Sequence, residues 1–171
     1  SKLYITSAEF AGIFVVWAVT DKDARKGKGI SCFLVPAGTP GLIIGKAEKK
    51  MGQHGSATNE VHFENCRIPA SAMMGKENAG FRIAVGELAG GRIGIGSLAL
   101  GLGLEAMHRA KAYIMEREQF GTKLGNMQGL QWMIADVETE LEAARLLLMQ
   151  AAWLKDEGKP FAKAASMAKL H

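Results

Sequence analysis

The sequence predicts an α+β fold, in which an antiparallel β-sheet or partial β-barrel is followed by the long helices of an up-down bundle. Two observations lead to this prediction. Short β-rich runs alternate with turn residues as far as Pro69, and beyond it apolar residues recur at helical spacing. At 171 residues, 48% of them hydrophobic, the chain can bury the core of one domain or of two small ones.

The part before Pro69 contains the predicted strands, which are residues 3–6, 13–20, 30–35, 42–46 and 60–67. Their regular spacing, with a Gly-Thr-Pro-Gly turn at 38–41, favours antiparallel pairing over β-α-β units. His62 lies in an alternating apolar and polar run and is predicted to face solvent. A catalytic histidine needs an orienting partner, and the sequence identifies none for it.

After Pro69, residues 81–88 and 92–118 are predicted to be helical. Glycine inside a helix costs up to about 1 kcal/mol relative to alanine. We therefore expect other backbone to pack closely against the glycines of this segment, which are Gly94, Gly96, Gly101 and Gly103. Apolar residues then recur in steps of three and four and predict a long bundle helix with a packing stripe at 127, 130, 134, 137, 141, 144 and 148. Gly158 and Pro160 should end this helix, and a third should begin near Phe161.

Composition argues against several functions. The net charge is +4, but the basic residues are scattered among 17 acidic ones, and the densest stretch, Lys22–Lys28, is typical of a hairpin loop. Binding to nucleic acid is therefore not expected. The apolar stretch 93–104 is too short to span a bilayer, so no membrane partner is expected. Cys32 and Cys66 lack metal or redox spacing and are predicted to be reduced packing residues.

The most informative segment is Met115–Gln128, where one helix ends in a charged turn with Phe120-Gly121 and another begins. Further motifs precede it: Tyr4-Ile5-Thr6-Ser7, residues 28–35, 38–42, Lys50-Met51-Gly52 with Ser56 and Thr58, residues 63–69, Gly80-Phe81, and Gly90-Gly91-Arg92-Ile93. In this order they resemble the acyl-CoA dehydrogenase family over essentially the whole chain. The run from Gly90 is most similar to the short-chain and branched-short-chain members.

The resemblance also implies a domain division. Residues 1–69 correspond to part of the family's middle β-domain, 70–79 to a linker, and 80–171 to the N-terminal part of the C-terminal helical bundle. Family members are considerably longer, so the chain is expected to be an interior fragment. Such a fragment would expose apolar faces and self-associate.

The activity implied by the resemblance is FAD-dependent α,β-dehydrogenation of short or branched acyl-CoA thioesters. Electrons would pass to an electron-transfer flavoprotein. The parent protein would be a homodimer or homotetramer in the bacterial cytoplasm or the mitochondrial matrix. Two alternatives stay open: a flavin-dependent monooxygenase or oxidase on the same fold, and an oligomerisation module without flavin.

The resemblance assigns site residues as well. Tyr4 would lie against the flavin ring and Thr6 would hydrogen-bond to it, although Tyr-Ile-Thr is also ordinary strand sequence. Arg117 would pair with a phosphate of the FAD in a neighbouring subunit, although an arginine at a helix C-terminus also complements the helix dipole. The remaining predicted cofactor contacts are Gln119, Phe120, Leu124, Met127 and Gln128, and the predicted substrate contacts are Phe81 and Arg92.

Two departures from the family pattern are visible. Ala89 stands where many members carry an aspartate that binds the pantetheine arm of CoA. Gly91 occupies the position at which a minority of members place the catalytic glutamate. No other glutamate matches a base position, so no catalytic residue and no metal ligand is expected in this chain, which alone should be inactive.

Overall fold

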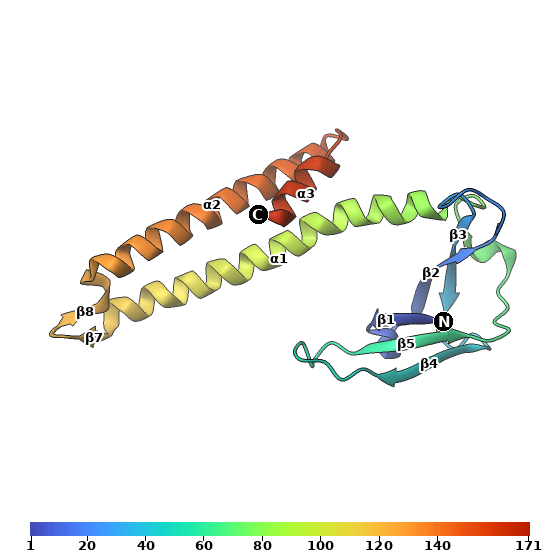
Figure 1. Ribbon diagram of the computed structural model, residues 1–171, viewed down its shortest axis with the longest axis horizontal. Coiled ribbons are helices and arrows are strands. Elements are labelled where there is room, and N and C mark those ends of the chain that lie inside the picture. The colour runs from blue at the N-terminus through green and yellow to red at the C-terminus, as the bar shows by residue number, and fades with distance from the viewer. The chain divides into compact units, whose positions relative to one another are not determined.

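The computed structural model describes all residues 1–171, which divide into two compact units, 1–84 and 85–171. The first unit is built from β-strands and the second from helices, as Figure 1 shows. The boundary between the units falls inside helix α1 (Gly80–Glu116). The predicted α+β class is confirmed.

The first unit contains two antiparallel three-stranded sheets. One has the order β1 (Lys2–Thr6), β5 (Thr58–Phe63), β4 (Leu42–Ala47), and the other β2 (Ile13–Val19), β3 (Ile30–Pro36), β6 (Met73–Met74). Each predicted strand is present, although the last ends at residue 63 instead of 67. Strand β6 escaped prediction because two residues are too few to show alternation.

The core of this unit is small and apolar. Its buried residues are Ala8, Phe14, Val35 and Val61, and half-buried side chains from both sheets pack around them. Short 3-10 turns at Ala8–Phe10 (η1) and Ala70–Ala72 (η2) connect the strands. Residues 20–29 form the loop of the β2–β3 hairpin, so the basic stretch lies in a hairpin loop as predicted.

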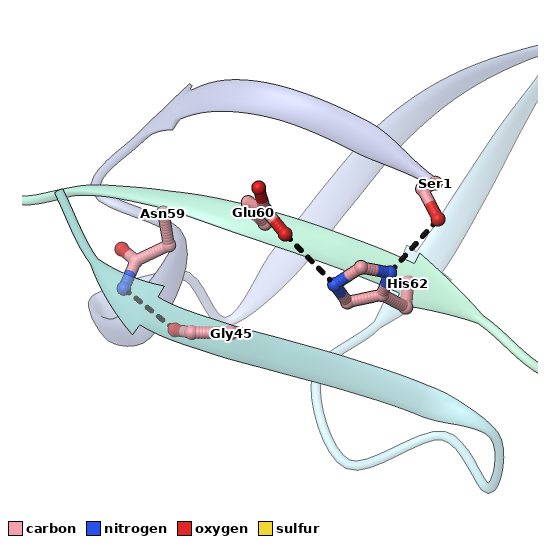
Figure 2. Close-up of polar contacts among 5 residues, drawn as sticks. All are labelled: Ser1, Gly45, Asn59, Glu60 and His62. Atoms are coloured by element: carbon pink, nitrogen blue, oxygen red, sulfur yellow. Dashed lines mark hydrogen bonds and ion pairs between the residues drawn. The ribbon is translucent and has the colours of Figure 1, made fainter.

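The β4–β5 ladder is irregular between Ile44 and Ala47, where Gly45 lies. Asn59 on β5 is almost fully buried, and its Nδ2 donates to the Gly45 carbonyl at 3.1 Å (Figure 2). Its Oδ1 has no hydrogen-bond partner. The amide therefore hydrogen-bonds to a carbonyl within the irregular part of the ladder, at the cost of one unpaired acceptor.

The second unit contains most of α1, α2 (Gln128–Asp156) and α3 (Ala162–Leu170). Helix α1 is continuous, whereas the sequence predicted two segments, because isolated glycines weaken a helix without ending it when packing supports it. Gly158, with φ of 65°, follows the end of α2 as predicted.

By length and composition, helix α1 is long and apolar enough to cross a membrane. The prediction from residues 93–104 was therefore wrong about the length of the apolar helix. A mostly buried core helix of a soluble protein passes the same test, whereas 6% of this apolar window is buried within the chain.

Helices α1 and α2 run antiparallel (Figure 1). Leucine side chains of α2 lie close to glycines of α1. A Cβ added at Gly96 or at Gly103 would lie 2.8 Å from Leu148 or Leu141, respectively. Farther along, Lys111 Nζ and Glu138 Oε1 form an ion pair at 2.7 Å. The predicted crowding is therefore confirmed at these two glycines, where the nearest atoms belong to leucine side chains and backbone approaches only at Gly96. It is wrong at Gly94 and Gly101, which have no atom within 4 Å of such a Cβ.

The packing stripe of α2 is largely confirmed. Leu148 is buried and most of the other stripe residues are half-buried. Val137 is the exception, with 38% of its surface exposed, because it lies beside an open groove between the helices.

Candidate functional site

The junction between α1 and α2 is a tight hairpin. Strands β7 (Glu118–Gln119) and β8 (Thr122–Lys123) pair antiparallel, and the 3-10 turn η3 (Leu124–Asn126) leads into α2. The two turn residues between the strands are Phe120 and Gly121, with φ of 55° and 74°. Two left-handed residues are the requirement of a type I′ hairpin turn.

Phe120 carries the strain of this turn. A left-handed conformation costs a residue with a side chain roughly 1–2 kcal/mol, so glycine or asparagine is the usual choice. The phenyl ring is 95% exposed and therefore gains almost nothing from packing within the chain. Phe120 therefore combines a costly backbone conformation with an accessible aromatic ring.

The other predicted residues of this junction surround the hairpin. Arg117 N donates to Tyr113 O and Leu124 N to Arg117 O, both at 2.9 Å, so the backbone on each side of the hairpin is fixed. The Arg117 side chain is exposed and has no ion-pair partner. Gln119 and Gln128 are also exposed, whereas Leu124 and Met127 are half-buried. A free guanidinium is thus located close to the exposed Phe120 in the chain.

Strand β1 presents the second group of predicted residues. Its pairing with β5 is irregular between Lys2 and Ile5, and Tyr4 within this irregularity has φ of 58°. Tyr4 is 73% exposed and Thr6 is exposed, while Ile5 packs against the core. The ring of Tyr4 and the hydroxyl of Thr6 are therefore both accessible on the strand.

Phe81 lines a surface cavity of about 460 Å³ at the start of α1. Gly27 lies against its ring, since an added Cβ there would be 3.8 Å from the ring carbons. The other lining residues are mostly charged: Lys28, Lys76, Glu77 and Arg82, together with Asn78 and Ala79. None of the three cations forms an ion pair. Three cations and the one carboxylate of Glu77 give the cavity lining a formal net charge of +2.

Arg92, the other predicted substrate contact, is half-buried on α1 and belongs to the second unit, whereas Phe81 belongs to the first. Ala89 is buried on the same helix. A Cβ added at Gly91 would have no atom within 4 Å, so the space beside this glycine is empty.

His62 has the partners that the sequence did not reveal. Its Nδ1 lies 2.8 Å from Ser1 Oγ, and its Nε2 lies 3.2 Å from Glu60 Oε2 (Figure 2). Glu60 and His62 are two residues apart on one strand and so share a face. The expectation that His62 lacks an orienting partner was therefore wrong. Because Ser1 is exposed and the other two are only partly covered, the group lies in water and we assign it to the surface.

A β-rich unit followed by antiparallel long helices defines an α+β protein with a β-domain and a helical-bundle domain. Two family models match it in that order: the acyl-CoA dehydrogenase middle domain over residues 1–66 and the acyl-CoA dehydrogenase C-terminal domain over residues 78–171. The chain belongs to the acyl-CoA dehydrogenase family.

Individual relatives agree with this membership. The chain is 47% identical to acryloyl-CoA reductase (NADH) of Anaerotignum propionicum, over 100% of this chain and 43% of that protein. It is 49% identical to the mitochondrial short-chain specific acyl-CoA dehydrogenase of Homo sapiens, over 99% of this chain and 41% of that protein. The structure of butyryl-CoA dehydrogenase from Megasphaera elsdenii superposes with a TM-score of 0.93 at 43% identity, over 98% of this chain and 43% of that one. The chain thus spans less than half the length of these relatives.

Proposed function

We propose that this chain is part of an FAD-dependent acyl-CoA dehydrogenase that acts on short or branched short-chain acyl-CoA thioesters. Within it, residues 1–69 would belong to the middle β-domain, 70–79 to a linker and 80–171 to the helical domain. The observation that carries the proposal is Phe120, an almost fully exposed aromatic ring on a strained backbone. It lies at the junction where the resemblance to the acyl-CoA dehydrogenases implies contact with FAD.

The isoalloxazine ring would contact β1. A flat aromatic side chain suits one face of the flavin, and a hydroxyl suits its polar edge, where charge develops on reduction. Tyr4 and Thr6 are both exposed on β1, which supports these roles. When bound, FAD supplies the hydride acceptor of the reaction.

The adenosine and pyrophosphate part of FAD would contact the α1–α2 junction of a neighbouring subunit. The free guanidinium of Arg117 suits a phosphate, and Phe120 suits a planar base or ribose edge. Gln119 and Gln128 add polar groups, and Leu124 and Met127 add apolar surface. A cofactor shared in this way requires a homodimer or homotetramer.

Acyl-CoA would extend past Phe81 and Arg92. The phosphates of CoA are anionic, and the unpaired Lys28, Lys76 and Arg82 around Phe81 give the positive charge that would attract them. Ala89 cannot hydrogen-bond to the pantetheine arm, so these other contacts would supply more of the affinity. Gly91 cannot remove the α-proton, so the base would come from residues outside this chain.

The electron acceptor would be an electron-transfer flavoprotein, as in the family members that the motifs resemble. The human relative is mitochondrial. We propose the mitochondrial matrix or the bacterial cytoplasm as the compartment.

A second candidate reaction is the reduction of an α,β-unsaturated acyl-CoA thioester. The 47% identity to a protein named acryloyl-CoA reductase (NADH) favours it. Both reactions use the same bond and the same flavin position, so the direction depends on the redox partner and not on the residues described above.

The test is a spectroscopic titration of the purified full-length protein. We expect a flavin absorption band that bleaches when butyryl-CoA or isobutyryl-CoA is added anaerobically, and reduction of a dye during turnover. NADH-dependent consumption of acryloyl-CoA would favour the reductase. Oxygen consumption without dye reduction would favour an oxidase, and absence of flavin would leave an oligomerisation module.

A further inference from the structure

We infer that a closed ring of hydrogen bonds among Thr20, Ser31 and Asn78 positions Phe81 for the acyl-CoA thioester. The inference rests on the proposed function, because it assigns Phe81 to the substrate. Thr20 directly follows β2, Ser31 lies in β3 and Asn78 lies in the turn before α1. The ring therefore links three segments of the first unit.

The ring is made of short bonds, each 2.7 Å long. Asn78 N donates to Ser31 Oγ, Thr20 Oγ1 and Ser31 Oγ share a bond, and Thr20 Oγ1 donates to Asn78 Oδ1. The amide oxygen of Asn78 can only accept, so Thr20 gives it its single proton. Ser31 must then donate to Thr20 while it accepts from Asn78 N–H. The direction of each bond is therefore fixed by the other two.

The burial of Ser31 gives the ring its importance, since Thr20 is exposed and Asn78 is half-buried. Ser31 is fully buried, so its hydroxyl depends on these partners because water cannot reach it. The one alternative acceptor for Thr20, the Gly29 carbonyl, is 3.5 Å away and is therefore much the weaker partner. Loss of the Thr20 hydroxyl would leave the Ser31 proton without an acceptor.

The residues that follow Asn78 are held against β3. Asn78 adopts φ of 63°, and Ala79 forms a parallel bridge with Ile30. Gly80 packs so closely that an added Cβ would lie 2.6 Å from the Ser31 carbonyl carbon. Trp17 Nε1 also donates to Gly80 O at 2.9 Å. Phe81 is the next residue, so its backbone position follows from the ring.

Phe81 needs this support because its own packing is weak. The side chain is 53% exposed, and its phenyl group lies beside Gly27. A half-exposed phenyl group is held mainly by its backbone. A phenyl group that is already in position loses less entropy when substrate binds. The hydrogen-bond ring should therefore lower KM for acyl-CoA and leave the chemical step unchanged.

The test compares Thr20→Val, which removes the hydroxyl at nearly constant volume, with Thr20→Ser, which keeps it. Both are made in the full-length flavoprotein and assayed with butyryl-CoA and a dye below their melting temperatures. We expect Thr20→Val to raise KM about fivefold, the equivalent of one hydrogen bond, with kcat and flavin content unchanged. Thr20→Ser should restore the wild-type KM. An unchanged KM in Thr20→Val, or equal KM values in the two variants, would overturn the inference.

A double-mutant cycle separates positioning from a general loss of stability. If the ring acts through Phe81, Thr20→Val should add nothing to KM in a Phe81→Ala background. Additive effects would overturn the inference. Should Thr20→Val fail to fold, Asn78→Gly removes the Oδ1 acceptor while keeping the N–H and the left-handed backbone, and it should raise KM in the same way. A wild-type protein without acyl-CoA turnover would instead reject the proposed function.

Discussion

Leu148 of α2 packs against the bare backbone at Gly96 of α1, where an added Cβ would lie 2.8 Å from Leu148 Cδ2. Leu148 is only 6% exposed and has little room to move away. The Ala168 carbonyl of α3 lies 3.6 Å from the same added atom. Residues of all three helices of the second unit therefore meet at this one glycine.

Gly96→Ala should destabilise the protein because the methyl group overlaps Leu148. Overpacking typically costs 1–3 kcal/mol, and the gain in helix propensity returns about 1 kcal/mol, so we expect a net loss of about 1 kcal/mol. Gly94→Ala is the matched control, since nothing lies within 4 Å of its added Cβ, and it should stabilise by up to about 1 kcal/mol. Urea denaturation of the two variants measures the change in the free energy of unfolding, which should fall for Gly96→Ala and rise for Gly94→Ala. A Gly96→Ala variant as stable as Gly94→Ala would contradict the packing.

Phe120→Gly should weaken FAD binding and leave the folded protein equally or more stable. Glycine adopts φ of 55° without strain, so the melting temperature should stay the same or rise, by the equivalent of about 1 kcal/mol. Loss of the ring should at the same time weaken FAD retention, which gel filtration and the ratio of flavin to protein absorbance measure. Phe120→Leu is the control that keeps the strained side chain but loses the aromatic ring. Full flavin content in both variants would remove Phe120 from the cofactor site.

Asn59→Asp should destabilise strongly. The amide donor to the Gly45 carbonyl would be replaced by an acceptor in an almost fully buried site, so two acceptors would face each other without a proton. Breaking such a buried pair costs about 3 kcal/mol or more. Glu60→Gln, on the neighbouring position of the same strand, should change stability by less than about 1 kcal/mol because the contact of Glu60 with His62 is partly exposed. Thermal melts of the two variants make the comparison.

The two cysteines should differ in reactivity. Burial raises the pKa of the Cys32 thiol, so less thiolate is present near neutral pH, and the buried sulfur is also inaccessible. Cys66 is half-buried. Under native conditions iodoacetamide should therefore alkylate Cys66 first, as peptide mass mapping would show. Equal rates in the native state, or Cys32 reacting first, would contradict the burial of Cys32.

The cations around Phe81 should contribute to CoA affinity through charge. Lys28→Gln and Lys76→Gln should each raise KM for acyl-CoA by about two- to threefold, the equivalent of an exposed charge pair, and more at low ionic strength. Lys22→Gln is the matched control, because Lys22 lies in the same hairpin loop as Lys28 but outside the cavity. It should leave KM for acyl-CoA unchanged. An equal response of all three variants would indicate general attraction and not a site.

The sequence by itself determined the kind and order of the secondary-structure elements and the family. Alternation of apolar and polar residues in the strands, the three-four spacing of α2 and the break at Gly158 are local patterns, and each predicts an element because neighbouring residues decide it. The motifs around Phe120 and Gly80 also lie in short continuous runs, so they could be recognised in order.

Only the tertiary structure decided which glycines of α1 meet a leucine and which face open space, since all four interrupt the helix pattern alike. It also showed that Ser1 and Glu60 flank His62, that Phe120 has a strained backbone, and that Thr20, Ser31 and Asn78 close a ring. The hydrogen-bond ring and the contacts between glycines and leucines join residues that are far apart in the sequence. The backbone of Phe120 depends on how its hairpin closes. The ring and the glycine contacts leave no periodic signal, because they arise only when distant segments fold against each other.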